Sequence, residues 1–371
     1  MCDLTTMSDL TNQTKTVLSL VQTDPSTQPI MFGDGMSLQR FDRPKYKQFL
    51  QLFDKQRAFF WGPERFDLTN DRADFERLTA AEQFIFVKNL QYQTLMDSVI
   101  GGGIDALKAS VSLPEVKVCF DAWGFFEGIH SFSYTYILKG VLPDRIREVF
   151  DTTLQDEEIV KRAMSVRGEY DRLLNSVSVD RKRETLLAIV ATQILEGVRF
   201  YLSFACSFSF AEPPSARMVA NATILKEICR DENLHVEITT NLLNIYRTVE
   251  QEGFTEVWKE CEPEIIEMFR KAADEEKAWA DYLMSRGSVF GLSAEALKGY
   301  VEWLVDRRLR NIGLKPIYNR TNPIGTWMDK WLGAAQVAPQ EVAVESYRVA
   351  SVANDLASKT KLGGSLTDLL G

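Results

Sequence analysis

The chain has 371 residues, of which 45% are hydrophobic and 26% charged, and its net charge is −9. This composition is typical of a globular protein with a sizeable core, and an acidic chain without a basic cluster is not expected to bind nucleic acid. Because the sequence shows no signal peptide and no uncharged apolar run of membrane-spanning length, and its five scattered cysteines form no CxxC pair, we expect a cytoplasmic protein that binds no membrane.

Helical patterns fill the middle of the chain, residues 31–337, between a flexible N-terminal arm (residues 1–30) and a flexible C-terminal tail (residues 338–371). About eight main helices are expected, and the sequence shows no strand-rich block or solenoid repeat. Five of the expected helices occupy residues 44–61, 145–154, 157–177, 255–286 and 293–311. The remaining helical segments place acidic residues within apolar surroundings.

One such helix begins at the capping box Thr79-Ala80-Ala81-Glu82 and is expected to end at Gly101-Gly102-Gly103. Its apolar stripe of Phe86 and Leu90 also includes Asp97. An acid in line with an apolar stripe is either a metal ligand or, more ordinarily, a polar group with a satisfied contact.

The next helix is expected to open with a second capping box at Ser112-Leu113-Pro114-Glu115. Trp123, Glu127, His130 and Tyr134 then follow at steps of four, three and four, so they share one face. Burying the carboxylate of Glu127 is costly unless something compensates its charge, and a metal ion does so. The ordinary alternative is a solvated pair of Glu127 and His130 on the helix surface.

A long run from Arg181 to Ala211 is apolar nearly all round and predicts a helix that is buried on most sides. Glu196 is the only acid in its apolar part, which favours a ligand role. After Pro213-Pro214, a helix from about Ala216 to Gln251 repeats the Glu-x-x-His spacing with Glu232 and His235.

Four acids and two histidines are thus expected in the interior: Asp97, Glu127, His130, Glu196, Glu232 and His235. Two divalent cations would cancel the charge of the four carboxylates. Helix bundles build di-iron and di-manganese centres from paired Glu-x-x-His words and two further carboxylates. Oxygen-rich ligation with one imidazole for each ion favours iron or manganese over zinc or copper. The sequence therefore predicts a dinuclear metal site in the core of an all-α helical bundle.

Tyr134 lies one helical turn past His130 and is close enough to be the group that an oxidised metal pair attacks. Its ordinary interpretation is a core tyrosine whose hydroxyl is hydrogen-bonded, but its place on the ligand stripe favours a redox role. Asp231, next to Glu232, is a candidate partner for the second imidazole nitrogen of a metal-bound histidine.

The sequence resembles the small, radical-carrying (beta) subunit of class I (Ia-like) ribonucleoside-diphosphate reductase from about Phe32 to Tyr347, with the motifs in the family's order. The matching stretches are Phe59-Phe60-Trp61, Met96-Asp97-Ser98, Trp123 to Tyr134, Glu196 to Phe208, Arg230 to His235 and Val337 to Val342. The resemblance implies a ferritin-like bundle that forms a homodimer.

The resemblance also assigns the ligands and the cofactor. It implies one metal held by Asp97, Glu127 and His130 and another by Glu196, Glu232 and His235, with Glu127 and Glu232 bridging. The cofactor would be two iron ions joined by oxygen (Fe–O–Fe), with manganese as the alternative metal, together with a stable tyrosyl radical on Tyr134.

Further roles follow from the same resemblance. An apolar pocket around the radical would consist of Phe200, Phe204 and Ile228. The radical-transfer residues would be Trp61 and Asp231, with His130, and then Glu341 and Tyr347 in the tail. The tail would dock on the large (alpha) subunit, which would use the radical to reduce ribonucleoside diphosphates to deoxyribonucleoside diphosphates.

The sequence departs from the family in two places. The segment between Asn175 and Leu186 lacks the hairpin insertion of some members, and the tail after Tyr347 has few acids. The main alternative is another ferritin-like di-iron oxidase of the desaturase or hydroxylase type. Iron storage and a non-catalytic helical interaction protein are further alternatives, and the last would leave the interior acids unexplained.

Overall fold

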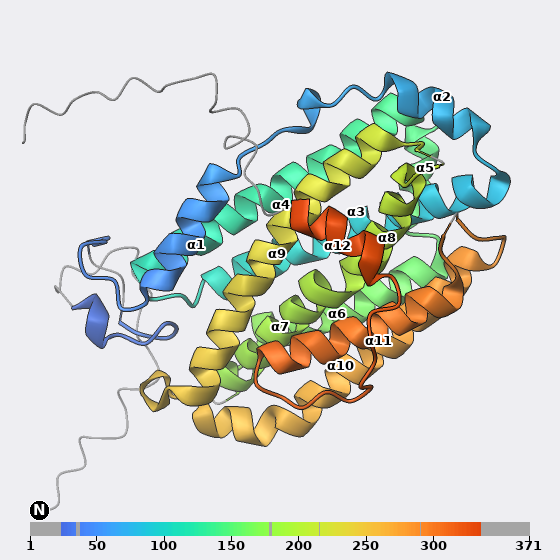
Figure 1. Cartoon of the computed structure of the whole chain (residues 1–371). Coiled ribbons are helices and arrows are strands. Elements are labelled where there is room, and N and C mark those ends of the chain that lie inside the picture. Colours follow the sequence, from blue (N-terminus) through green and yellow to red (C-terminus); the bar gives the residue numbers. More distant parts are fainter. Residues whose placement is uncertain (1–23, 35–37, 178–179, 215, 290, 335–371) are drawn as a thin grey trace, which may run out of the picture. The chain divides into compact units, whose positions relative to one another are not determined.

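The structure is a computed structural model, and it describes residues 24–34, 38–177, 180–214, 216–289 and 291–334. Within these ranges every regular element is a helix, apart from an isolated bridge between Met31 and Val111 (Figure 1). The prediction of an all-α fold is therefore confirmed.

The helices are α1 (Lys47–Ala58), α2 (Thr69–Arg77), α3 (Ala80–Lys108), α4 (Pro114–Val141), α5 (Ile146–Thr153), α6 (Glu157–Asn175), α7 (Arg181–Ile194), α8 (Phe200–Ala211), α9 (Val219–Thr248), α10 (Thr255–Met284), α11 (Ala294–Asn311) and α12 (Gly325–Ala334). A π-helical segment, Leu195–Arg199, joins α7 to α8, and we call it the π segment. Helices α1, α5, α6, α10 and α11 lie close to their expected bounds, whereas α2 and α12 are not among the expected helices.

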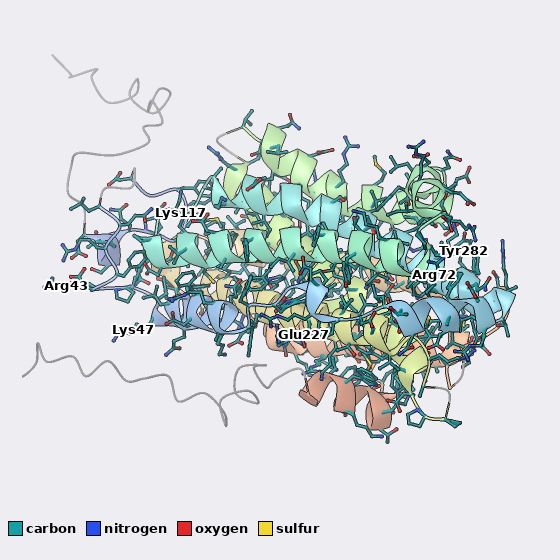
Figure 2. The ribbon with its side chains drawn as sticks, turned by 90° about the horizontal axis from the view of Figure 1, so that it is seen from above. Arg43, Lys47, Arg72, Lys117, Glu227 and Tyr282 are labelled. Carbon is teal, nitrogen blue, oxygen red and sulfur yellow. The ribbon has the colours of Figure 1, made fainter. Side chains whose placement is uncertain are left out.

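The core consists of α3, α4, α9 and the continuous run of α7, the π segment and α8 (Figure 1). Helix α1 packs against α4 and α9, while α6 and α10 pack against α7 and α11 packs against α10. The run Arg181–Ala211 is long and apolar enough to cross a membrane, but its most apolar window is fully buried inside the protein. The apolar character of this run is therefore explained by its place as the central helix of the core. Figure 2 shows charged side chains such as Lys47 on α1 and Arg72 on α2 on the outside of the helices.

Helix α3 begins at the predicted capping box of Thr79, but the prediction that it ends at Gly101-Gly102-Gly103 is wrong, because it continues to Lys108. A Cβ added at Gly103 would lie 2.4 Å from Cζ of Tyr170 on α6. This glycine therefore permits close packing of two helices without interrupting the helical hydrogen bonds. The sequence alone does not distinguish a close approach from a helix end.

The second predicted capping box, at Ser112–Glu115, is also wrong, because the start of α4 has no side-chain cap. Ser112 Oγ accepts a hydrogen bond from the backbone N–H of Gly33 at 2.6 Å. Glu115 Oε1 accepts hydrogen bonds from the backbone N–H groups of Lys45 and Tyr46, just ahead of α1. Both side chains thus bind distant segments, which local spacing does not reveal.

Most of the predicted arm and the whole predicted tail, including Glu341 and Tyr347, lie outside the described residues. The end of the arm, residues 24–30, is described. Ile30 is buried, and its backbone N–H donates a hydrogen bond of 2.6 Å to Glu252 Oε2.

Candidate metal centre

Six buried side chains meet in the core of the bundle. Helix α3 supplies Asp97, α4 supplies Glu127 and His130, the π segment supplies Glu196, and α9 supplies Glu232 and His235. Each of these residues is at most 2% exposed. The structure thus brings all six predicted ligands together from distant parts of the sequence.

Two glutamates lie between the two histidines. Nδ1 of His130 lies 3.6 Å from Glu127 Oε2 and 3.3 Å from Glu232 Oε1. Nδ1 of His235 lies 3.2 Å from Glu127 Oε1 and 2.8 Å from Glu232 Oε2. Each glutamate therefore presents one oxygen to each histidine, which is the arrangement that a carboxylate bridging two metal ions requires.

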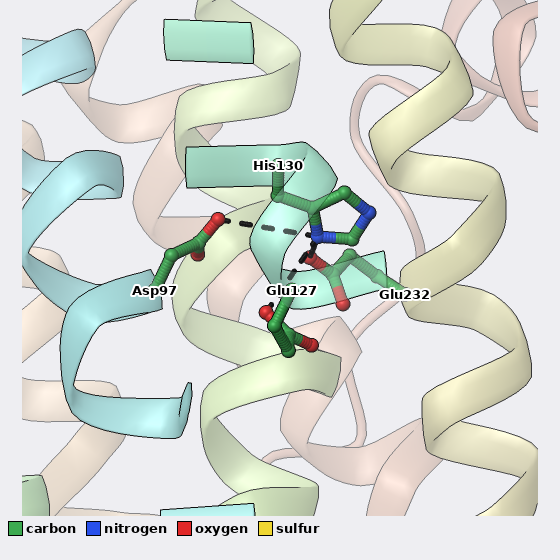
Figure 3. Close-up of side chains that lie close together, drawn as sticks. All are labelled: Asp97, Glu127, His130 and Glu232. Carbon is green, nitrogen blue, oxygen red and sulfur yellow. Dashed lines mark ion pairs between the residues drawn. The ribbon is translucent and has the colours of Figure 1, made fainter. Parts of the chain in front are cut away.

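Asp97 and Glu196 each complete one half of the centre. Asp97 Oδ2 lies 3.9 Å from Nδ1 of His130, and Glu196 Oε2 lies 3.5 Å from Nδ1 of His235. Within each half, one potential ligand atom from every residue lies within 4.8 Å of the others. Figure 3 shows the first half, in which Asp97 and the two shared glutamates surround the imidazole of His130.

Several buried polar atoms of this cluster have no hydrogen-bond partner among the described residues, and they show whether the site fits cations. Both oxygens of Asp97 and Glu196 have no hydrogen-bond partner among the described residues, and neither do Glu127 Oε2, Glu232 Oε1 and His130 Nδ1. Burial and nearby carboxylates raise the pKa of Asp97 and of Glu196 well above the usual range. Two divalent cations would supply the missing partners and cancel the repulsion, so the residues fit a dinuclear metal centre.

One of the two imidazoles is oriented from outside the cluster. Asp231 Oδ2 accepts a hydrogen bond of 2.7 Å from Trp61 Nε1 and lies 3.2 Å from Nε2 of His130. The acceptor at this position assigns the proton of His130 to Nε2, which leaves the lone pair of Nδ1 facing the carboxylates. Trp61, Asp231 and His130 thus form a continuous buried chain that reaches the centre.

Tyr134 is fully buried, and its hydroxyl lies beside Asp97 but makes no hydrogen bond of normal geometry to a described residue. Burial raises its pKa well above the usual value, and the charges of Asp97 and Glu232 raise it further. The phenol therefore keeps its proton at neutral pH. Of the predicted pocket residues, Phe200 and Phe204 lie on α8 and Ile228 on α9, and all three are fully buried.

Two features of the centre were not expected from the sequence. Trp123 lies on the predicted stripe, but only the structure shows that its Nε1 donates a hydrogen bond of 2.8 Å to Glu127 Oε1 and that its ring stacks on His235. Glu196 lies in a π-helical turn, in which the backbone N–H of Phe200 bonds to the carbonyl of Leu195. Such turns occur often at functional sites. The apolar run around Glu196 gives no local sign of this turn.

Comparisons with known proteins decide the family. A family model described as "Ribonucleotide reductase, small chain" matches residues 39–323. The chain belongs to this family. The beta subunit of ribonucleoside-diphosphate reductase from Haemophilus influenzae is 39% identical over 363 residues, which cover 91% of this chain and 96% of the relative. The reductase 1 beta subunit of Escherichia coli O157:H7 is 38% identical over 367 residues, covering 92% and 96%.

A solved structure agrees with the small-subunit fold. The ribonucleotide reductase R2 subunit from Clostridium botulinum superimposes with a TM-score of 0.75 at 28% identity, covering 86% of this chain and 96% of that chain. The predicted ferritin-like fold and the predicted class I ribonucleotide reductase small subunit are thereby confirmed. The comparisons give no support to the alternative of a desaturase or hydroxylase.

Proposed function

We propose that this small subunit binds two iron ions in the described cluster and that Tyr134 carries the stable radical which a large subunit uses to reduce ribonucleoside diphosphates. The observation that carries the proposal is the position of Glu127 and Glu232, each of which offers one oxygen to His130 and one to His235. The chain would act in the cytoplasm.

The six clustered side chains would divide between the two ions. Asp97 and His130 would bind one ion, Glu196 and His235 the other, and the two shared glutamates would bridge them. The chemistry that a bound iron pair supplies is the reduction of dioxygen, coupled to one-electron oxidation of a nearby side chain. Manganese remains the alternative metal, because the same ligand types suit both ions.

Tyr134 would be the side chain that is oxidised. Because burial keeps its phenol protonated, oxidation removes an electron and a proton and leaves a neutral radical. Water and reductants are excluded from this fully buried residue, which would prolong the life of the radical. Phe200, Phe204 and Ile228 would form the apolar surroundings.

The chain of Trp61, Asp231 and His130 would conduct the oxidising equivalent between the centre and the large subunit. Both hydrogen-bonding contacts of this chain converge on one oxygen, Asp231 Oδ2. The route would continue to Glu341 and Tyr347 in the tail, which would dock on the large subunit.

Truncation before Tyr347 tests the tail. The shortened chain is expected to form the radical as the full chain does, because none of the clustered residues is removed, but to lose association with the large subunit and nucleotide reduction. Radical content measured by electron paramagnetic resonance, together with a pull-down and a turnover assay, checks both parts. Retained turnover would contradict the proposed route through the tail.

An apolar face of α4 supports a homodimer. Phe125 and Phe132 are seven residues apart on this helix and are 55% and 50% exposed, and the ring of Phe60 packs 6.2 Å from that of Phe125. Gly128 lies between the two phenylalanines, and a Cβ added there would meet nothing within 4 Å, so the helix surface between the two rings is open. We propose that a second copy of the chain covers this face, since a two-fold interface pairs the same patch from both subunits.

The double substitution Phe125→Asp and Phe132→Asp is expected to convert the dimer to a monomer, because a dimer would have to bury four unpaired carboxylates. Analytical ultracentrifugation measures the change. Met164→Asp is the matched control, since Met164 is equally exposed on α6. A double variant that remains dimeric would place the interface elsewhere.

The proposal as a whole is tested by adding ferrous iron and then air to metal-free protein. We expect ferric absorption bands and a tyrosyl-radical resonance. Ferric bands without a radical would instead favour the desaturase or hydroxylase chemistry or a requirement for manganese. A folded protein that binds neither iron nor manganese would exclude the proposed function.

A further inference from the structure

The π segment that carries Glu196 is held by two helices that contribute none of the six clustered ligands. Helices α10 and α11 pack against each other and both contact the π segment (Figure 1). Arg199, the last residue of the segment, donates to Glu275 at 2.6 Å and to Glu276 at 3.0 Å, both on α10. The end of the segment is therefore fixed to α10 by one buried and one partly buried ion pair.

Arg308 on α11 contacts the middle of the same segment. Its Nε donates a hydrogen bond of 2.9 Å to the backbone carbonyl of Gly197, the residue after Glu196. A Cβ added at Gly197 would lie 2.7 Å from this Nε. Gly197 therefore serves to leave space for the arginine side chain. It does not serve to adopt a backbone conformation that only glycine favours.

The environment of Arg308 is unusual for a cation. The residue is only 3% exposed, and no ion pair of Arg308 is found among the described residues. Besides Gly197, its guanidinium contacts the ring of Tyr201 at 5.1 Å. Buried arginines are normally paired with carboxylates, because desolvating the charge is costly. A specific task at the π segment would account for this exception.

Arg308 also connects the two helical segments that carry the second half of the centre. The hydroxyl of Tyr201, whose ring lies against Arg308, donates a hydrogen bond of 2.6 Å to Asn233 Oδ1. Asn233 adjoins Glu232 on α9. One buried side chain thus touches the residue after Glu196 and, through Tyr201, the residue after Glu232.

We infer that Arg308 is a positioning residue for the second metal site: its hydrogen bond to Gly197 stabilises the π-helical turn and thereby the direction of Glu196 toward His235. A π-helical turn is rare in an otherwise α-helical run and requires stabilising contacts. Asp97 and His130, in the first half, lie on α3 and α4 and do not depend on this turn. This inference rests on the proposed two-metal function.

Manganese(II) titration of metal-free protein tests the inference, with binding followed by calorimetry and electron paramagnetic resonance. Wild-type protein is expected to bind two ions and to give the signal of a spin-coupled pair. Arg308→Met is expected to weaken the second ion by roughly 10- to 100-fold, the range for loss of a side chain that orients a metal ligand. The first ion would bind as before, so the six-line signal of an isolated ion would appear at intermediate concentrations.

Gly197→Ala tests the same contact by changing the residue that accepts the hydrogen bond from Arg308. Alanine favours a helix, so its effect should arise from displacing the guanidinium of Arg308, and the same selective loss of the second ion is expected. This variant also decides the matter if Arg308→Met fails to fold. Arg308→Lys, which keeps a donor on a flexible stem, should lie between wild type and Arg308→Met. Arg310→Met is the matched control, because Arg310 is exposed on the same helix.

The outcomes separate this inference from the proposed function. Wild-type protein that binds two ions, with folded variants at Arg308 and Gly197 that bind both ions as tightly, would overturn the positioning role alone. Equal weakening of both ions would also overturn it and would indicate a general structural role. Folded wild-type protein that binds neither manganese nor iron would exclude the proposed function and this inference together.

Discussion

Tyr134→Phe is expected to abolish nucleotide reduction while leaving both metal ions bound. Phenylalanine keeps the ring but has no hydroxyl to lose a proton, so no stable radical can form at this position. The fall in turnover with the large subunit should be on the order of 10³-fold or more, as for removal of an essential reacting group. The radical resonance should vanish, and the metal content and ferric absorption bands should remain.

The same substitution has an expected effect on stability. The hydroxyl of Tyr134 is buried and makes no hydrogen bond of normal geometry to a described residue, and a buried hydroxyl without such a bond costs about 1–3 kcal/mol. The free energy of unfolding of the metal-free protein should therefore stay the same or increase, as measured by denaturant titration. Tyr246→Phe is the matched control, because its hydroxyl is equally buried and unpartnered. That control should keep full activity.

Undiminished turnover in Tyr134→Phe would show that the radical lies on another residue or that the metal pair itself is the oxidant. Loss of metal in this variant would show instead that Tyr134 supports the centre structurally. Either result would require a different account of the chemistry, although the family assignment would be unaffected.

Glu232→Ala is expected to remove both metal ions, because Glu232 belongs to both halves of the centre. The number of bound ions, measured by elemental analysis after loading, should fall from about two to about zero per chain, since each ion loses a charged ligand. Wild-type protein should be stabilised by added metal, by about 2.7 kcal/mol for each bound ion at a hundredfold excess over its Kd. The variant should show no such increase in thermal unfolding experiments.

Asp97→Ala and Glu196→Ala are the controls, since each residue belongs to only one half of the centre. Each should lose one ion and keep the other, giving about one ion per chain. If Glu232→Ala also retained one ion tightly, the glutamate would be a ligand of a single metal, and the bridging arrangement would be wrong. Comparing the three variants therefore tests the topology of the site rather than metal binding in general.

Sequence spacing determined much of the site, because the relevant periodicity is local. A step of three residues places Glu127 with His130, and Glu232 with His235, on one helical face. A single acid in an apolar run, such as Glu196, has to lie in the interior once that run is helical. All six predicted ligands consequently meet in the structure. Helices α9 and α10 begin and end near their expected residues, whereas α3 extends past its expected end.

What the tertiary structure decided depends on contacts between segments far apart in the chain. The hydrogen bond from Arg308 to Gly197 has no local signature, because the two residues lie 111 positions apart in the chain. The apolar run around Glu196 gives no sign of the π-helical turn. In the sequence, Gly103 cannot be told from a glycine that ends a helix. Only the structure shows that it lies within a continuing helix and makes room for the ring of Tyr170. Local spacing thus fixed which groups enter the core, whereas packing between distant helices fixed the direction in which each group points.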